Sequence, residues 1–322
     1  MFLERDSFLN ELDAARARAV AGHGCVVLVS GEAGIGKTTL VERFSQHAQQ
    51  TDQRVRVLWG ACDALFTPRP LGPLLDMTRQ MQGQLRELVR GGVERERLFA
   101  GMLDELSRTS VPTIAVFEDV HWADEATLDL LKFLARRVAR TNGLLVLTFR
   151  DDEVDAAHPL RRLLGELPTA SVRRLRLPPL SEAAVAHLAA AAGRAARDLH
   201  TSTGGNPFYV TELLAMQGSG TPTSVRDAVL ARAARLDRAA LEALDVVSVV
   251  PGRSERWLVD ALVPGPAVDQ AINAGLLIAT RDHVAFRHEL ARRAWEDSLE
   301  PGRAADLHAR VLHALEKESG SA

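Results

Sequence analysis

The chain has 322 residues, which at roughly 150 residues per domain predicts about two domains. Apolar residues make up 46% and charged residues 25%, which excludes wholesale disorder, and the net charge of −3 gives no overall basic excess for nucleic-acid binding. Because no apolar run approaches about 18 residues and the start is charged, we expect neither a membrane span nor a secretory signal. The two cysteines, Cys25 and Cys62, are too few for a disulfide framework or a zinc site, so we expect buried thiols and a cytoplasmic location.

Short apolar runs alternate with longer segments of helical period through the first 178 residues. This alternation predicts an α/β fold, with a parallel sheet covered by helices on both faces. The predicted strands are residues 25–30, 55–59, 113–117, 144–149 and 172–177. The predicted helices are residues 37–49, 71–82, 95–108, 125–140 and 158–165.

Strand signals stop after Leu177, and Pro178-Pro179 breaks the chain. Ser181 is a candidate N-cap for the next helix, and the turn ending at Pro207 starts another. The remaining predicted helices are residues 182–192, 208–216, 225–235, 238–249, 255–262, 266–274, 289–298 and 303–317. Residues 276–280 and 283–287 flank Arg281-Asp282, which predicts a tight hairpin among helices, the pattern of a winged helix. We therefore expect a nucleotide-binding domain at 1–178, a small helical domain at 179–222 and a winged-helix domain at 223–322.

A glycine-rich motif of the form G-x-x-x-x-G-K-[ST] follows the first predicted strand and opens a helix. Its glycines let backbone amides wrap around phosphate oxygens, and the helix N-terminus adds positive charge. Lys37 is expected to reach the β- and γ-phosphates and Thr38 to bind Mg²⁺. Only three of the 39 basic residues are lysines, which makes a lysine in this loop more telling. The motif predicts binding of ATP or ADP by Gly31, Glu32, Ala33, Gly34, Ile35, Gly36, Lys37, Thr38 and Thr39.

Two carboxylates, Glu118 and Asp119, end the apolar strand at residues 113–117. A Mg²⁺ ion on a triphosphate needs an acidic partner at the end of a neighbouring strand, and a second carboxylate orients the attacking water. We assign Glu118 to the metal and Asp119 to the water, although the sequence leaves open an exchange of these roles. Asp124 is predicted to cap the helix that follows.

The segment Phe117-Glu-Asp-Val-His-Trp-Ala-Asp-Glu-Ala-Thr-Leu resembles the Walker B region of the STAND class of signal-transduction ATPases, and among them the large ATP-binding LuxR-type regulators. The strand ending in Arg150 resembles the sensor strand of this class, whose arginine faces the γ-phosphate. Gly205-Asn-Pro207 resembles its G-x-P turn, whose proline packs on adenine. Phe286-Arg-His288-Glu resembles its winged-helix motif, whose histidine contacts the β-phosphate of ADP.

The same resemblance implies that Arg5 lies beside the adenine, although members usually have a glycine where this chain has Glu4. The residues themselves allow simpler interpretations. Arg5 fits a solvated surface arginine, and Arg150 fits a surface ion pair. Pro207 fits an ordinary helix start, and His288 fits a capping or core histidine. The four tryptophans are predicted to be core residues.

The resemblance implies a switch that ADP holds closed, and that self-associates with ATP and hydrolyses it slowly through Lys37, Glu118, Asp119 and Arg150. It also implies sensor and DNA-binding domains beyond residue 322. The alternatives are an AAA-type DNA-handling ATPase, such as an origin-binding or clamp-loading protein, and a small-molecule kinase. Residues 223–322 hold 13 basic and 15 acidic residues, so we expect no direct DNA binding from this segment.

Overall fold

The structure is a computed structural model that describes residues 2–63, 69–109, 111–216 and 221–319. The chain divides into two compact units, Phe2–Pro178 and Pro179–Ala322. Among the helices of the described ranges, none is long and apolar enough to cross a membrane.

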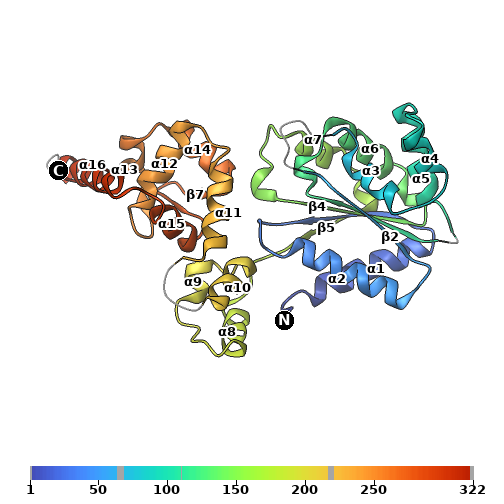
Figure 1. Ribbon diagram of the computed structural model, residues 1–322, viewed down its shortest axis with the longest axis horizontal. Coiled ribbons are helices and arrows are strands. Elements are labelled where there is room, and N and C mark those ends of the chain that lie inside the picture. Colours follow the sequence, from blue (N-terminus) through green and yellow to red (C-terminus); the bar gives the residue numbers. More distant parts are fainter. Residues whose placement is uncertain (1, 64–68, 110, 217–220, 320–322) are drawn as a thin grey trace. The chain divides into compact units, whose positions relative to one another are not determined.

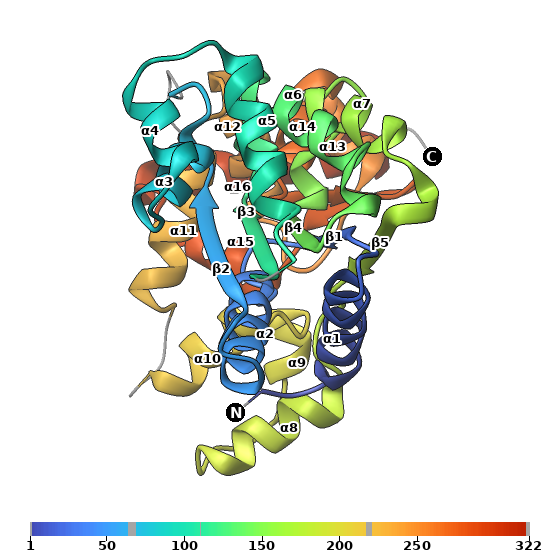
Figure 2. The same ribbon diagram turned by 90° about the vertical axis from the view of Figure 1, so that its right-hand side faces the viewer.

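A five-stranded parallel sheet is the centre of the N-terminal unit. Its strands are β1 (Cys25–Ser30), β2 (Arg56–Ala61), β3 (Thr113–Glu118), β4 (Gly143–Phe149) and β5 (Val172–Arg176). They lie in the order β2-β3-β4-β1-β5, so β1 is central and β2 forms an edge, beside which α3 lies in Figure 2. All five strands and their parallel pairing confirm the predicted α/β sheet, with bounds shifted by at most two residues.

Helices cover both faces of this sheet. They are α1 (Asp6–Val20), α2 (Lys37–Thr51), α3 (Gly72–Arg79), α4 (Gln84–Arg90), α5 (Arg95–Leu106), α6 (Glu125–Ala135), α7 (Pro159–Glu166) and the short 3-10 helices η1 (Val120–Trp122), η2 (Val138–Arg140), η3 (Asp151–Glu153) and η4 (Thr169–Ser171). Figure 1 shows α1 and α2 on one face, with α3, α5, α6 and α7 on the other. Side chains of β1 therefore alternate between two apolar cores: Val26 and Leu28 face one, and Val27 and Val29 the other.

The structure corrects one expectation for the helices of this unit and adds two helices. The segment 125–140 is not one helix, because α6 ends at Ala135 and the separate turn η2 follows. The helices α1 and α4 were not predicted. Asp124 does cap α6, since its side chain accepts a hydrogen bond from the Thr127 amide at 3.0 Å.

The C-terminal unit is mostly helical. Its helices are α8 (Glu182–Ala191), α9 (Leu199–Thr203), α10 (Pro207–Ala215), α11 (Thr223–Ala233), α12 (Arg238–Ser248), α13 (Arg256–Leu262), α14 (Gly265–Asn273), α15 (Glu289–Glu296) and α16 (Pro301–Ser319). Three short strands, β6 (Ser254–Glu255), β7 (Leu277–Ala279) and β8 (His283–Phe286), form an antiparallel sheet in the order β6-β8-β7. The Thr280 amide donates to the His283 carbonyl at 2.8 Å and closes the predicted hairpin around Arg281-Asp282. Ser181 caps α8 as predicted, whereas α9 was not predicted.

Candidate nucleotide-binding site

The register of the sheet brings three strand ends to one edge. Ser30 of β1 pairs with Phe149 of β4, and Phe117 of β3 pairs with Leu147. The glycine loop follows β1, Glu118 and Asp119 lie at the end of β3, and Arg150 follows β4, so segments that are about 30 to 120 residues apart in sequence meet here.

The glycine loop connects β1 to α2 with backbone angles that L side chains rarely adopt. Gly31, Gly34 and Gly36 have φ values of +146°, +78° and +95°. A Cβ atom at Gly31 would lie 3.1 Å from the Leu177 carbonyl oxygen and 3.0 Å from the side chain of Ile35. Ile35 is buried, whereas Thr38 and Thr39 are exposed in the first turn of α2. Glycine is thus required by conformation and by space, while the start of the helix is open to a ligand.

The ammonium group of Lys37 folds back over this loop. Its Nζ atom donates to the Gly31 carbonyl at 2.8 Å and to the Glu32 carbonyl at 2.9 Å. Burial lowers the pKa of Lys37 to about 8, an effect that the Asp119 carboxylate opposes and the Arg150 guanidinium reinforces. Among the described residues, the hydrogen-bond acceptors of this ammonium are two neutral carbonyl oxygens. A phosphate group would supply a charged acceptor for it.

Glu118 is held between two side chains from different elements. Its Oε1 atom accepts a hydrogen bond from the hydroxyl of Thr38, and its Oε2 atom accepts one from the indole Nε1 of Trp59 at 3.0 Å. Hydroxyl and carboxylate oxygens are the ligands that Mg²⁺ prefers when substrate phosphates supply the rest. Among the described residues, no three His, Cys, Asp or Glu side chains cluster as a metal site of their own. The Thr38–Glu118 pair fits a metal that arrives with a nucleotide.

Asp119 has a different environment from its neighbour. It adopts a left-handed backbone conformation with φ of +51°, and its amide donates to Thr148 Oγ1 at 2.9 Å. Burial raises the pKa of Asp119, while the charges of Arg150 and Lys37 oppose the rise. Thr148 is a fully buried residue of β4 that the motifs did not reveal. A polar residue near the end of an otherwise apolar strand was the signal for it.

Arg150 is engaged by neighbouring side chains. Its guanidinium pairs with Glu153 three residues later and stacks on the Trp122 ring, 4.6 Å from the centroid. The buried His121 ring lies between two carboxylates, 3.9 Å from Asp119 and 3.7 Å from Glu153. Arg150 is therefore close to the site but holds a local ion pair, and a γ-phosphate would have to compete with Glu153 for it.

Arg5 is buried, so it is not the solvated surface residue that one interpretation expected. Only 3% of its surface is exposed, and its guanidinium donates to the Pro178 carbonyl at 2.7 Å and to the Ile35 carbonyl at 3.5 Å. Burial lowers the pKa of Arg5, and the charge of Glu4 opposes this shift. The side chain thus connects the glycine loop to the last residue of the unit.

Glu4, which stands where the resembling proteins have glycine, has φ of +56°. We expect Glu4→Gly to raise the free energy of unfolding by about 1 kcal/mol relative to Glu4→Ala, because both remove the charge but only glycine relieves the left-handed conformation. Urea unfolding measures the difference. Glu11→Gly and Glu11→Ala are the matched pair, because Glu11 is an exposed residue inside α1. Here the order of stability should reverse, with a free energy of unfolding about 1 kcal/mol lower for Glu11→Gly than for Glu11→Ala. Equal stability of the two Glu4 variants would contradict a strained backbone here.

Comparison with known proteins agrees with this geometry. Residues 1–147 match the family model described as the AAA ATPase domain. The chain carries an AAA-type P-loop ATPase domain. An uncharacterised protein of Rhizobium meliloti (strain 1021) is 24% identical over 395 aligned positions, which cover 99% of this chain. The chain spans 37% of the length of that relative.

Two solved structures share the fold. The Walker-type ATPase of Pyrococcus abyssi has a TM-score of 0.62 at 12% identity, over 91% of this chain and 96% of its own. The ORC2 protein of Aeropyrum pernix, solved as ADPNP and ADP complexes, has a TM-score of 0.60 at 14% identity, over 99% and 95%. At such identities the likeness concerns the fold alone.

Pro207 and His288, predicted to contact the nucleotide, lie together in the C-terminal unit. Pro207 opens α10 after Asn206, whose side chain caps the helix by accepting from the Phe208 amide at 3.1 Å. His288 is buried, and its ring packs edge-on against Tyr209, with the centroids 4.8 Å apart. A Cβ atom at Gly204 would lie 2.9 Å from His288 Nδ1, so the turn before Pro207 packs closely against the imidazole.

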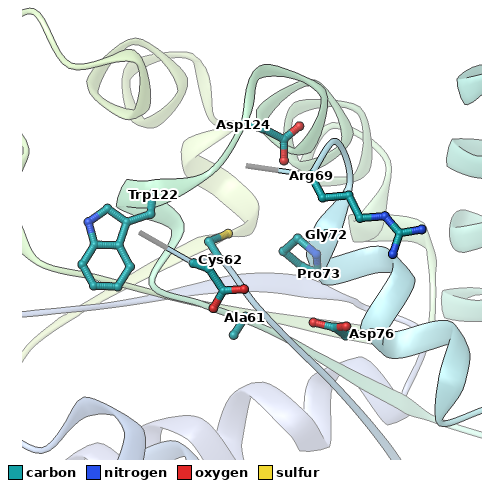
Figure 3. Close-up of a pocket in the computed structure, with 9 residues that line it drawn as sticks. Ala61, Cys62, Arg69, Gly72, Pro73, Asp76, Trp122 and Asp124 are labelled. Carbon is teal, nitrogen blue, oxygen red and sulfur yellow. The ribbon is translucent and has the colours of Figure 1, made fainter. Parts of the chain in front are cut away.

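A pocket of about 230 Å³ opens beside the candidate site at the end of β2. Figure 3 shows Trp122 across from Gly72, Pro73 and Asp76 of α3, with Cys62 between them. Burial raises the pKa of Cys62 to about 12, and Cys25 is also a buried free thiol, as predicted. The pocket and the Arg150 stack share Trp122.

The expectation that all tryptophans are core residues is confirmed only in part. Trp295 is buried, but Trp59, Trp122 and Trp257 are only half-buried. Trp59 and Trp122 pack against the two cores of the sheet and also contact charged groups of the site.

Proposed function

We propose that the chain is the nucleotide-operated switch of a signal-responsive transcriptional regulator of the STAND class. The observation that carries the proposal is the buried cation of Lys37 on the glycine loop, together with the bond between Thr38, the next residue, and Glu118. This arrangement supports binding of ADP or ATP with Mg²⁺. In the proposal, ADP holds a closed state, and ATP favours an open state that self-associates.

We propose one role for each of these side chains of the site. Lys37 neutralises the β- and γ-phosphates, and Thr38 with Glu118 holds Mg²⁺, whose charge would offset that of the phosphates. Asp119 orients the water, which is supported by the burial of its carboxylate and by the bond of the Thr38 hydroxyl to Glu118. Arg150 leaves its ion pair with Glu153 and contacts the γ-phosphate instead. Since that exchange gives up an existing ion pair, hydrolysis is expected to be slow.

The C-terminal unit supplies the second half of the switch. Pro207 is proposed to pack on adenine and His288 to donate to the β-phosphate, and their shared surroundings at Gly204 and Tyr209 support a common role. The helices and the sheet β6-β8-β7 support a winged-helix domain at 223–322 after a helical domain at 179–222. The sensor and DNA-binding domains are proposed to lie outside this sequence, since the chain spans 37% of its relative.

A DNA-handling ATPase is the second candidate. The fold that the chain shares with the ORC2 protein of Aeropyrum pernix is compatible with this candidate as well as with the first. The balance of 13 basic and 15 acidic residues in 223–322 speaks against it, because phosphate-backbone binding needs a basic excess. A small-molecule kinase is the third candidate, and it leaves Pro207 and His288 without a role.

Single substitutions of the two carboxylates test the proposal. We expect Glu118→Gln to weaken Mg²⁺-dependent binding of ATP and Asp119→Asn to retain binding but slow hydrolysis by about a hundredfold, the contribution of a positioned base. Calorimetry with and without Mg²⁺ and a phosphate-release assay measure the two effects. Asp129→Asn, a surface carboxylate paired with Arg95 at 3.4 Å, is the matched control.

The same assays separate the candidates. If the two variants show the opposite behaviour, the roles of Glu118 and Asp119 are exchanged. If duplex DNA accelerates turnover many-fold, the DNA-handling ATPase becomes the better assignment. The regulator proposal expects turnover that is independent of DNA.

A further inference from the structure

The structure places one indole against the carboxylate proposed to hold the metal. Trp59 Nε1 donates to Glu118 Oε2 at 3.0 Å, while Glu118 Oε1 accepts from the Thr38 hydroxyl. The two oxygens of Glu118 therefore have different partners. One faces the proposed metal-binding hydroxyl, and the other is fixed from a neighbouring strand.

The backbone of Trp59 is itself held in place. Trp59 lies on the edge strand β2, two residues before Ala61, which pairs with Glu118 in β3. Its amide donates to the side-chain oxygen of Gln80 at 3.0 Å, and the side-chain amide of Gln80 donates back to the Trp59 carbonyl. Gln80 thus occupies the free edge of β2 at this residue and fixes the strand from which the indole reaches Glu118.

We propose that Trp59 is a positioning residue that orients Glu118 for Mg²⁺, an inference that rests on the proposed function. An indole N–H is only a donor, so its bond to Glu118 Oε2 fixes that oxygen as the acceptor and leaves Oε1 on the side of Thr38. A carboxylate that binds Mg²⁺ through one oxygen rotates freely unless its second oxygen is bonded. Outer partners of this kind typically change metal affinity by about 10- to 100-fold.

The test is the Mg²⁺ dependence of ADP binding to the full chain, measured by calorimetry. We expect Trp59→Phe, which keeps an aromatic ring, to raise the Mg²⁺ concentration at half effect by about tenfold or more. ADP affinity in EDTA should stay unchanged, because Lys37 and the glycine loop are intact. Trp295→Phe is the matched control, since Trp295 Nε1 donates to Asp245 at the same 3.0 Å in the other unit. It should leave the Mg²⁺ dependence unchanged.

A double-mutant cycle keeps the inference testable if Trp59→Phe also lowers stability. Trp59 is proposed to act through Glu118. In a Glu118→Gln background, Trp59→Phe should therefore not raise the Mg²⁺ concentration at half effect any further. The positioning role would be overturned if Trp59→Phe raised the Mg²⁺ concentration at half effect equally in both backgrounds. It would also be overturned if Trp59→Phe alone left that concentration unchanged. Failure of the wild-type chain to bind ADP with or without Mg²⁺ would instead overturn the proposed function, and the inference with it.

Discussion

Lys37→Met is expected to abolish nucleotide binding and at the same time to stabilise the nucleotide-free protein. Binding is lost because the methionine cannot supply the charge that faces the phosphates. A hydrogen bond to a charged group contributes about 1.5–3 kcal/mol, so the loss of contacts to two phosphates predicts at least a hundredfold weaker ADP binding. Calorimetry with ADP and Mg²⁺ measures this loss.

Stabilisation follows from the pKa of Lys37, which burial lowers from 10.5 to about 8. Below pH 8 the folded protein keeps the ammonium buried at a cost of about 3 kcal/mol, since each pKa unit corresponds to about 1.4 kcal/mol. Between pH 8 and 10.5 the unfolded chain binds more protons than the folded one, so wild-type stability rises with pH. Lys37→Met removes the titrating group, and its advantage in unfolding free energy should be largest at pH 7 and shrink toward pH 10.

The matched control is Lys132→Met, because Lys132 is a partly exposed lysine that pairs with Glu166 on the surface. It should leave ADP binding unchanged, and it should not raise the free energy of unfolding at pH 7. If Lys37→Met melts at a lower temperature than the wild type at pH 7, the buried ammonium does not destabilise the folded state. Retained ADP binding would contradict the assignment of the phosphate site itself.

The sheet and the phosphate loop were predictable because their signals are local. Uninterrupted apolar runs such as residues 25–29 predict strands buried on both faces, and the structure shows such a strand at β1. The glycine motif specifies its own backbone, since φ values above +75° at Gly34 and Gly36 leave few alternatives to glycine. Sequence alone also placed Glu118 and Asp119 at the end of a strand, which the bounds of β3 confirm.

The missed features depend on contacts between distant segments or on weak local signals. The buried residues of α1 are Leu12, Ala15 and Ala19. Because two of the three are alanines, the buried face of α1 differs little in hydrophobicity from its exposed face, and the helical period is weak in the sequence. Trp59 looked like an ordinary core residue because its partner, Glu118, is 59 residues away. The burial of Arg5 requires the Pro178 carbonyl, 173 residues later, so no local pattern could show it. By contrast, the Arg150–Glu153 pair had a local signal, a spacing of three residues.

His288→Ala is expected to release ADP about ten to a hundred times faster than the wild type. In the proposed switch the imidazole donates to the β-phosphate, and a hydrogen bond to a charged group contributes about 1.5–3 kcal/mol. That free energy corresponds to about one to two orders of magnitude in affinity. Lys37 and Thr38 remain in place, so ATP binding should persist. Stopped-flow displacement of a fluorescent ADP analogue measures the release rate.

The structure also makes His288 part of the packing of its unit, so the experiment has to separate packing from ligand contact. The ring lies against Tyr209, and the substitution leaves a void beside Gly204. Tyr209→Leu loosens the same packing but keeps the imidazole, which makes it the matched control. Faster ADP release in His288→Ala alone supports a contact with the phosphate, and equal acceleration in both variants shows that loosened packing is the cause. If release is faster only in His288→Ala, light scattering in ATP should also show more self-association, because the closed state has lost a contact that the open state does not use.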